Sequence, residues 1–206
     1  MTAADPRLER WLAALAAGRG LTAVRDPAEL RRVHVEDALA AAELVHDGPV
    51  VDVGSGGGSP GLPLAAARPE LRVDLLESQR RRCDFLVAAA AEFPNVRVVC
   101  ARAEEHGRGE GREAYGAAIA QALAPPPVAL EWCLPLVRVG GRVILLAGEV
   151  DLERAALAAD AVGGGVPERA PLPGTERRSL LLVAKARATP EGFPRRPGLA
   201  RKRPLA

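Results

Sequence analysis

The chain has 206 residues, of which 48% are hydrophobic, 26% charged and 3% aromatic, and its formal net charge at pH 7 is +2. This length suits one domain with a sizeable core, and so few aromatic side chains argue against a platform on which several bases stack. Because no apolar stretch reaches 18 residues and the N-terminus lacks a basic region followed by an apolar segment, we expect no membrane span, no secretory signal and a cytoplasmic location.

Two helices are predicted over residues 1–47. The first ends near Gly18 to Gly20 and carries apolar residues at helical spacing, namely Leu8, Trp11, Leu12 and Leu15. The second runs from Pro27 to Val45. His34 lies in this second helix, where we expect a packing or hydrogen-bonding role.

Residues 48–188 alternate between strands and helices. The strands are expected at 49–53, 71–76, 96–100, 115–120, 141–147 and 179–186. The helices are expected at 62–68, 79–92, 126–137 and 150–162, and a glycine-rich, charged segment from Gly107 to Gly116 is expected to form a mobile loop. Strands separated by helices of this length predict βαβ units with a parallel sheet and right-handed crossovers.

A glycine-rich loop follows the first predicted strand. Residues 50–64 read V-V-D-V-G-S-G-G-G-S-P-G-L-P-L. The β-branched residues suit a buried strand, whereas the glycines permit positive φ and close approach of a ligand. The prolines lead into a helix whose first amides would point at that ligand.

Acidic residues follow the next two predicted strands. Glu77 ends the second strand, 25 residues after Asp52, where a doubly wound sheet would place it to accept both hydroxyls of a ribose. Glu77 also suits the N-terminus of the helix that follows. After the third strand, the backbone amide of Ala103 and the carboxylate of Glu104 could meet the amino edge of an adenine.

Two classes of cofactor fit this arrangement. The spacing Gly56-x-Gly58-x-x-Gly61 formally permits a dinucleotide such as NAD. D-x-G-x-G-x-G followed by an acid-ended strand instead resembles motifs I and II of class I S-adenosylmethionine-dependent methyltransferases. A P-loop is excluded, because no G-K-[ST] follows the glycines.

The cysteines and the C-terminal tail suggest a reducing environment and a polyanionic partner. Cys83, Cys100 and Cys133 are far apart in sequence and form no C-x-x-C pair, so we expect three reduced thiols. Residues 185–206 hold seven Lys or Arg and one Glu, which is +6 and leaves −4 for the other residues. We expect the proline-rich tail, residues 189–206, to lie extended on the surface and to contact phosphates.

The whole set of motifs resembles the small-subunit rRNA methyltransferase G family, also called glucose-inhibited division protein B. The resemblance runs from about Gly20 to Ala206. It comprises L-T-A-V-R-D-P, R-x-H-x-x-D-x-L, the glycine loop with P-G-L-P-L, L-L-E-S-x-x-R-R-C-x-F-L and R-A-E-E. It closes with T-P-E-G-F-P-R-R-P-G-L-A-R-K-R-P-L, the most specific single segment.

The resemblance implies one methyltransferase domain over residues 1–206, with N-terminal helices (1–47), a Rossmann-like α/β core of class I type (48–188) and the basic tail (189–206). It implies transfer of a methyl group from S-adenosylmethionine to N7 of one guanine, guanine 527, of 16S rRNA by a monomeric protein that acts on 16S rRNA or a small-subunit precursor. No catalytic acid or base is expected, because guanine N7 carries a lone pair and no proton. The expected cofactor-binding residues are Asp52, Gly54, Gly56, Gly58, Ser59, Glu77, Ala103, Glu104 and Gln121.

Three positions depart from the family pattern. Gln121 replaces an arginine, Gly116 an aspartate and Ala147 a lysine, which removes two positive charges and one negative charge near the expected active face. Gln121 could still hydrogen-bond the base or the methionine carboxylate, without charge assistance. The alternative hypothesis is therefore a catalytically impaired relative that binds the cofactor and RNA. A small-molecule methyltransferase is a third hypothesis, against which the basic tail argues.

Overall fold

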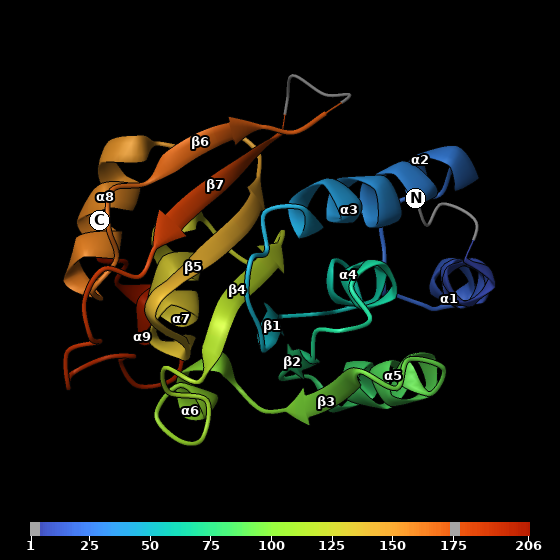
Figure 1. Cartoon of the computed structure of the whole chain (residues 1–206), viewed down its shortest axis with the longest axis horizontal. Coiled ribbons are helices and arrows are strands. Elements are labelled where there is room, and N and C mark those ends of the chain that lie inside the picture. Colours follow the sequence, from blue (N-terminus) through green and yellow to red (C-terminus); the bar gives the residue numbers. More distant parts are fainter. Residues whose placement is uncertain (1–4, 174–177) are drawn as a thin grey trace.

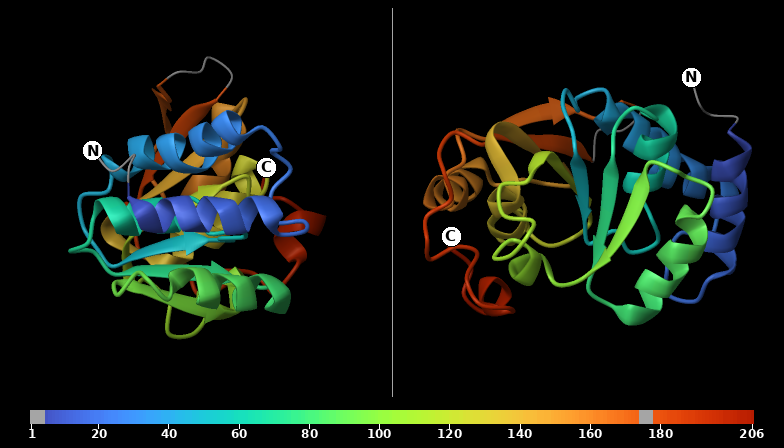
Figure 2. Two further views of the ribbon diagram at one scale, coloured as in Figure 1. Left: turned by 90° about the vertical axis from the view of Figure 1, so that its right-hand side faces the viewer. Right: turned by 60° about the horizontal axis from the view of Figure 1, so that its bottom comes forward.

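A seven-stranded sheet forms the centre of the protein and carries helices on both faces (Figure 1, Figure 2). The computed structural model describes residues 5–173 and 178–206. The strands lie in the order β3-β2-β1-β4-β5-β7-β6. Their bounds are β1 (Val50–Val53), β2 (Val73–Glu77), β3 (Val96–Cys100), β4 (Tyr115–Gln121), β5 (Val137–Ala147), β6 (Glu168–Pro171) and β7 (Ser179–Ala184). Strands β1 to β5 pair in parallel, whereas β7 pairs antiparallel with β5 and β6. The predicted mostly parallel α/β sheet is confirmed.

The helices are α1 (Pro6–Ala17), α2 (Pro27–Arg31), α3 (Asp37–Ala42), α4 (Gly61–Ala67), α5 (Arg80–Ala90), α6 (Ala103–His106), α7 (Pro126–Cys133), α8 (Leu152–Ala161) and α9 (Leu199–Lys202). Helix α1 begins after Asp5, whose side chain caps the helix by accepting a hydrogen bond from Arg7 N, and it ends at Ala17, close to the predicted end. The second predicted helix is less regular than expected. It consists of α2, a π-helical turn (Arg32–Glu36) and α3, and it ends at Ala42 instead of Val45.

Helices bury both faces of the sheet, and successive residues of a strand point to opposite faces. In β1, Val50 belongs to the apolar cluster beneath α1, α3, α4 and α5, whereas Val51 belongs to the cluster beneath α7 and α8. This explains why the strand sequences read as continuous apolar runs.

Some boundaries differ from the prediction. Helix α7 ends at Cys133 and is followed by a 3₁₀ turn (Leu134–Leu136), because Pro135 cannot donate the hydrogen bond that would continue an α-helix. Strand β5 consequently begins at Val137 instead of residue 141. Strand β6 and the short helices α6 and α9 were not predicted. Each has only four residues, too few to show a period.

The expectation of three reduced thiols is wrong for two of them. Cys83 in α5 and Cys100 at the end of β3 form a disulfide, with Cα atoms 5.8 Å apart. Cys133 in α7 is a free, buried thiol. The pair was missed because its members lie on different elements, and only the packing of α5 against β3 brings them together.

The tail lies on the surface over most of its length, but it is not extended throughout and is held at several points. Thr189 and Ala200 are buried, and α9 forms within the segment. The loop from Gly107 holds the tail in place, since Arg112 donates hydrogen bonds to the carbonyl oxygens of Thr189 and Phe193. Tyr115 and Gly116, the last residues expected in this loop, belong to β4, which begins at Tyr115 as predicted.

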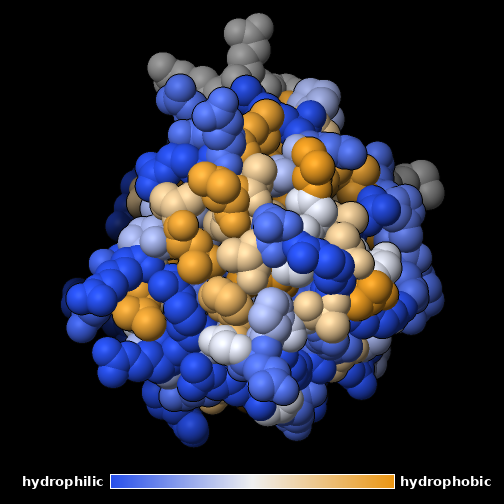
Figure 3. All heavy atoms as spheres, turned by 90° about the vertical axis from the view of Figure 1, so that its left-hand side faces the viewer, coloured by the Kyte–Doolittle hydropathy of each residue, from blue (hydrophilic) through white to orange (hydrophobic). Residues whose placement is uncertain are grey.

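The surface on the side of α8 and the C-terminal end mixes apolar and hydrophilic side chains (Figure 3). Leu157 and Val166 are 65% and 81% exposed. The end of the tail lies against α8, because Arg154 Nη2 donates a hydrogen bond to the Ala206 carbonyl oxygen at 2.6 Å. Within the part of the chain that the structure describes, no helix is long and apolar enough to cross a membrane.

Candidate functional site

A cavity of about 370 Å³ lies at the carboxyl ends of β1, β2 and β3. In this sheet β1 lies between β2 and β4, so the chain crosses over in opposite directions on its two sides. Such a switch point leaves a crevice outside the strand ends, where α/β proteins bind ligands. Among the predicted cofactor contacts, the cavity is lined by Gly54, Glu77, Ala103 and Glu104.

The glycine loop brings backbone close to this cavity. Gly54 has φ +72°, and a Cβ there would lie 2.4 Å from Leu123 Cδ1. Its N–H donates to the Leu76 carbonyl oxygen at 2.7 Å, which holds the turn against β2. Gly54 is thus required both for the backbone conformation and for the space beside Leu123.

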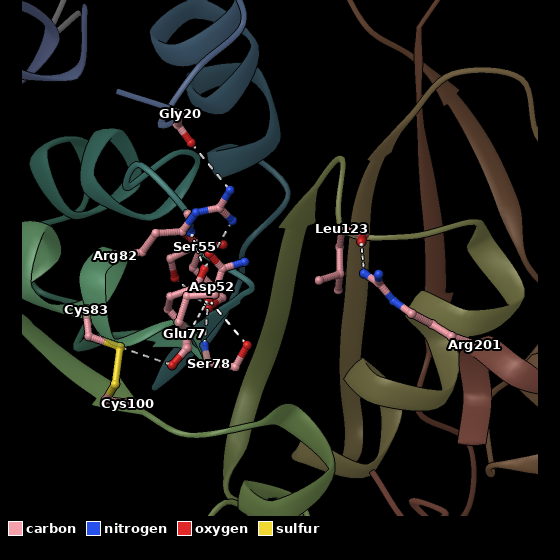
Figure 4. A network of polar contacts seen from close by, with 12 residues as sticks. Gly20, Asp52, Ser55, Glu77, Ser78, Arg82, Cys83, Cys100, Leu123 and Arg201 are labelled. Carbon is pink, nitrogen blue, oxygen red and sulfur yellow. Dashed lines mark hydrogen bonds and ion pairs between the residues drawn. A yellow bond between two sulfur atoms is a disulfide. The ribbon is translucent and has the colours of Figure 1, made fainter. Parts of the chain in front are cut away.

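Glu77 ends β2 and is 4% exposed. Its Oε2 accepts a hydrogen bond from Gly56 N at 3.0 Å, and its Oε1 accepts from Ser78 N and Gln79 N at 2.7 and 2.8 Å (Figure 4). Three backbone N–H groups therefore fix the carboxylate at the wall of the cavity. Both roles predicted for Glu77 are compatible with this geometry. Its carboxylate binds amides at the start of α5, and the same residue lines the cavity.

Glu104 lies in the first turn of α6 and is 4% exposed. Its Oε1 accepts a hydrogen bond from Gly198 N in the tail at 2.9 Å. Gly198 and Arg201 line the same cavity, as does Trp132 of α7. These three residues were missed from the sequence, because no local pattern links them to the glycine loop.

Asp52, Gly56, Gly58, Ser59 and Gln121 are predicted cofactor contacts outside this lining. Asp52 is fully buried, and its Oδ2 accepts a hydrogen bond from Gly61 N at 3.0 Å. Burial raises the pKa of Asp52 to about 7, although the hydrogen bond from Gly61 opposes the shift. Asp52 therefore supports the start of α4 from beneath the loop.

Ser59 and Gln121 lie together on the other side of the loop. Ser59 Oγ is 2.9 Å from Gln121 Oε1 and 3.0 Å from the His34 carbonyl oxygen. Gln121 Nε2 donates to the Val33 carbonyl oxygen at 3.1 Å. The two side chains thus connect the ends of β1 and β4 to the N-terminal helices. His34 Nε2 is 2.9 Å from Thr22 Oγ1, a contact that fits a structural role.

A second cavity of about 480 Å³ adjoins the first, and Ala122 and Leu123 line both. Ala122 has φ +51°, a conformation that costs energy for a residue with a Cβ and that recurs at ligand sites.

Two departures from the family pattern, Gln121 and Ala147, line this second cavity. The third, Gly116, lies at the opposite end of β4, where its N–H donates to the Pro49 carbonyl oxygen, so the expectation that it lies near the active face is wrong.

Arg178 supplies a positive charge to the second cavity. Its Nη1 donates to Asp37 Oδ2, whereas its Nη2 is buried and has no hydrogen-bond partner among the described residues. Burial raises the pKa of Asp37, and the charge of Arg178 opposes that shift. Arg178 was missed because it is one of 26 arginines in the sequence. No histidine or cysteine lines either cavity, and no group of three potential metal ligands occurs among residues 5–173 and 178–206.

Solved structures share this fold. A predicted O-methyltransferase from Agrobacterium tumefaciens superposes with a TM-score of 0.60 at 22% identity, over 75% of this chain and 83% of the other. A 16S rRNA N2 G1207 methyltransferase from T. thermophilus, in complex with AdoMet and guanosine, superposes with a TM-score of 0.54 at 21% identity, over 74% of this chain and 39% of the other. The fold is therefore the Rossmann-like fold of class I methyltransferases.

Sequence comparison is more specific than the fold. Residues 6–164 match the family described as rRNA small subunit methyltransferase G. The ribosomal RNA small subunit methyltransferase G of Moorella thermoacetica is 42% identical over 197 residues, which cover 90% of this chain and 82% of the relative. The protein of the same name from Symbiobacterium thermophilum is 40% identical over 202 residues, at the same coverage. The chain therefore belongs to the rRNA small subunit methyltransferase G family.

Proposed function

We propose that the protein transfers a methyl group from S-adenosylmethionine to N7 of a guanine in 16S rRNA, which by family resemblance is guanine 527. The observation that carries the proposal is the pair of adjoining cavities. The first is lined by the glycine loop and the strand-end acids, and the second is largely apolar. A polar cofactor and a flat base would occupy neighbouring sites that meet at Ala122 and Leu123.

The residues of the first cavity fit the proposed cofactor. Glu77 presents a buried carboxylate that can accept hydrogen bonds from ribose hydroxyls, and Gly54 leaves room for close approach. Glu104 Oε2 accepts no hydrogen bond from the described residues and can accept one from an exocyclic amino group. When bound, S-adenosylmethionine supplies a methyl group on a positively charged sulfur, which is a good leaving group.

The chain's own contribution to the chemistry is orientation and exclusion of water. Guanine N7 needs no deprotonation, so the absence of histidine and cysteine from the lining of both cavities is compatible with the reaction. The apolar walls of the second cavity, such as Leu145 and Pro125, would hold a base away from water. Gln121 and Arg178 are the polar groups there that we expect to contact the base or its phosphates.

Arginines around the first cavity give a phosphate backbone places to bind. Arg82 and Arg102 line it on the side of α5 and α6, and Arg201 lines it on the side of the tail. Arg80, at the start of α5, is 84% exposed at its side chain. Several such contacts would give an affinity for RNA that falls steeply with salt. We further propose that the protein acts as a monomer in the cytoplasm on 16S rRNA or a precursor of the small subunit.

Methyl incorporation into small subunits from cells that lack this modification tests the proposal. We expect one methyl group per subunit, located at a guanine by cleavage chemistry specific for N7-methylguanine. Folded protein that binds S-adenosylhomocysteine yet transfers no methyl group would contradict the enzymatic function.

That negative outcome would support the alternative, a relative that binds the cofactor and RNA without catalysis. The observation that favours it is the absence of a cation at positions 121 and 147, both of which line the second cavity. The double substitution Gln121→Arg with Ala147→Lys separates the two cases. Activity gained only in the double variant would identify an impaired substrate site.

A further inference from the structure

The first cavity has an end that neither the glycine loop nor Glu77 forms. Trp132 of α7 lines this end and is 7% exposed. Its indole Nε1 is buried and has no hydrogen-bond partner among the described residues. A buried donor that is left unpaired costs free energy, so an acceptor on a ligand would be favoured there. Trp11 provides a contrast, because its Nε1 donates to the Gly57 carbonyl oxygen at 2.7 Å.

The tail completes this end of the cavity. The guanidinium carbon of Arg201 lies 5.2 Å from the centre of the Trp132 ring, a cation–π contact. Arg201 Nη2 also donates to the Leu123 carbonyl oxygen at 3.3 Å. Ala200 is buried in the apolar cluster that contains Trp132, with Ala103 packed against it. Trp132 and the tail are thus in contact with the segment expected to meet an adenine.

Gly198 determines which oxygen of Glu104 remains available. Gly198 has φ +79°, a conformation that turns the chain into α9, and its N–H binds Glu104 Oε1. Oε2 accepts no hydrogen bond from the described residues. The tail therefore orients the Glu104 carboxylate and leaves its Oε2 available as an acceptor in a cavity that Trp132 also lines.

We propose that Trp132 and the tail segment Gly198–Arg201 form the base-recognising end of the cofactor cavity. The indole N–H donates to a ring nitrogen of the purine, Glu104 Oε2 accepts from its amino group, and the Arg201–Trp132 pair closes the cavity behind the base. The inference rests on the proposed use of an adenosyl cofactor. It assigns the tail a role in cofactor binding, in addition to any contact with RNA.

Nuclear magnetic resonance of the intact protein gives a direct test. The sequence contains two tryptophans, so two indole N–H signals are expected, and Trp11→Phe assigns them. Adding S-adenosylhomocysteine should move the Trp132 indole proton downfield, because it gains a hydrogen bond, and should leave the Trp11 proton nearly unmoved. An unmoved Trp132 signal at saturation would overturn the proposal.

Calorimetric titration with S-adenosylhomocysteine measures the contributions. Trp132→Phe keeps an aromatic ring and removes the N–H, and we expect the Kd to rise about tenfold, the effect of losing one buried hydrogen bond. Arg201→Met should raise the Kd about threefold to tenfold by the same reasoning for the cation–π contact. Lys202→Met is the matched control, because Lys202 is adjacent in α9 but does not line the cavity, and its Kd should stay within about twofold.

The outcomes separate this inference from the proposed function. If the unsubstituted protein does not bind S-adenosylhomocysteine, the proposed function fails. If it binds, and if Trp132→Phe and Arg201→Met bind as tightly as the unsubstituted protein, the proposed function stands and the role of Trp132 and Arg201 is refuted. Thermal melting of each ligand-free variant checks that a change in Kd does not reflect unfolding.

Discussion

Glu131 in α7 and Arg195 in the tail form a buried, two-pronged ion pair. Glu131 is 1% exposed, and its Oε1 and Oε2 accept hydrogen bonds from Arg195 Nε and Nη2 at 2.7 and 2.5 Å. Arg195 Nη2 also donates to the Arg203 carbonyl oxygen at 2.8 Å. One basic residue of the tail is therefore committed to the folded domain and is not free to bind phosphate.

Removing this arginine should destabilise the protein. We expect Arg195→Ala to lower the free energy of unfolding by roughly 3 kcal/mol, because it leaves the Glu131 carboxylate buried without a partner. Urea unfolding followed by circular dichroism measures the change. Arg203→Ala, an exposed neighbour whose side chain makes none of these hydrogen bonds, should change the free energy by less than about 0.5 kcal/mol. Equal losses for the two variants would show that the ion pair is not what holds the tail.

Arg178 should matter for the substrate and not for the cofactor. It lines only the second cavity, and its Nη2 is buried without a partner among the described residues. We expect Arg178→Met to lower kcat/KM for rRNA methylation by about tenfold or more, since one charge-assisted hydrogen bond is lost. The Kd of S-adenosylhomocysteine should stay within about twofold. Asp37→Asn is the control for stability, because it removes the charge that Arg178 pairs with and keeps Arg178 itself. If Asp37→Asn lowers kcat/KM as much as Arg178→Met does, the loss of activity comes from folding.

Burial of Asp52 should make stability depend on pH. The pKa of Asp52 is raised to about 7 in the folded protein, from 3.8 in the unfolded chain. The folded state thus favours the protonated form, and the stability that this group contributes is present below pH 3.8 and is lost as the pH rises through about 7.

The substitution Asp52→Asn tests this assignment, because asparagine resembles the protonated acid and can still accept from Gly61 N. It should leave the free energy of unfolding nearly unchanged at acidic pH and raise it by on the order of 4 kcal/mol at alkaline pH. Unfolding curves across this pH range measure the difference. A difference that does not vary with pH would contradict the assignment.

Reduction of the Cys83–Cys100 disulfide should destabilise the protein. The two cysteines are 17 residues apart, and reopening a loop of that size costs roughly 3 kcal/mol of stability in the chain-entropy account. For a chain of this length that corresponds to a fall in Tm of roughly 6–12 °C, measured in the presence of dithiothreitol. The double variant Cys83→Ser with Cys100→Ser should melt at one temperature with or without reductant. If reductant lowers its Tm as well, the effect does not come from this disulfide.

The central sheet and the first cavity were largely predictable from the sequence. Runs such as V-V-D-V and V-D-L-L-E are mostly apolar and predict buried strands. The glycines between a strand and a helix indicate a loop at a strand end. Because parallel strands place their carboxyl ends at one edge, Gly54, Glu77, Ala103 and Glu104 were expected together, and all four line one cavity.

Other features depend on contacts between residues far apart in sequence. Nothing near Cys83 indicates Cys100 as its partner, and nothing in α7 indicates that Glu131 binds Arg195. The tail looked like a free basic end because charge and proline content are local properties. Gly116 was expected near the active face because it belongs to a family motif. A motif does not show at which end of a strand a residue lies, and Gly116 lies at the end of β4 away from the site.

The class of fold, the family and the strand-end positions that meet at the switch point could all be predicted from the sequence, because periodicity and motif spacing are carried by neighbouring residues. Three features depend on the tertiary structure alone. The tail folds back onto Glu104 and Trp132, Arg178 supplies a positive charge to the second cavity, and Ser59 and Gln121 hold each other between the loop and the N-terminal helices. These contacts arise from the packing of whole elements, in which burial and hydrogen-bond satisfaction select partners that no local pattern specifies.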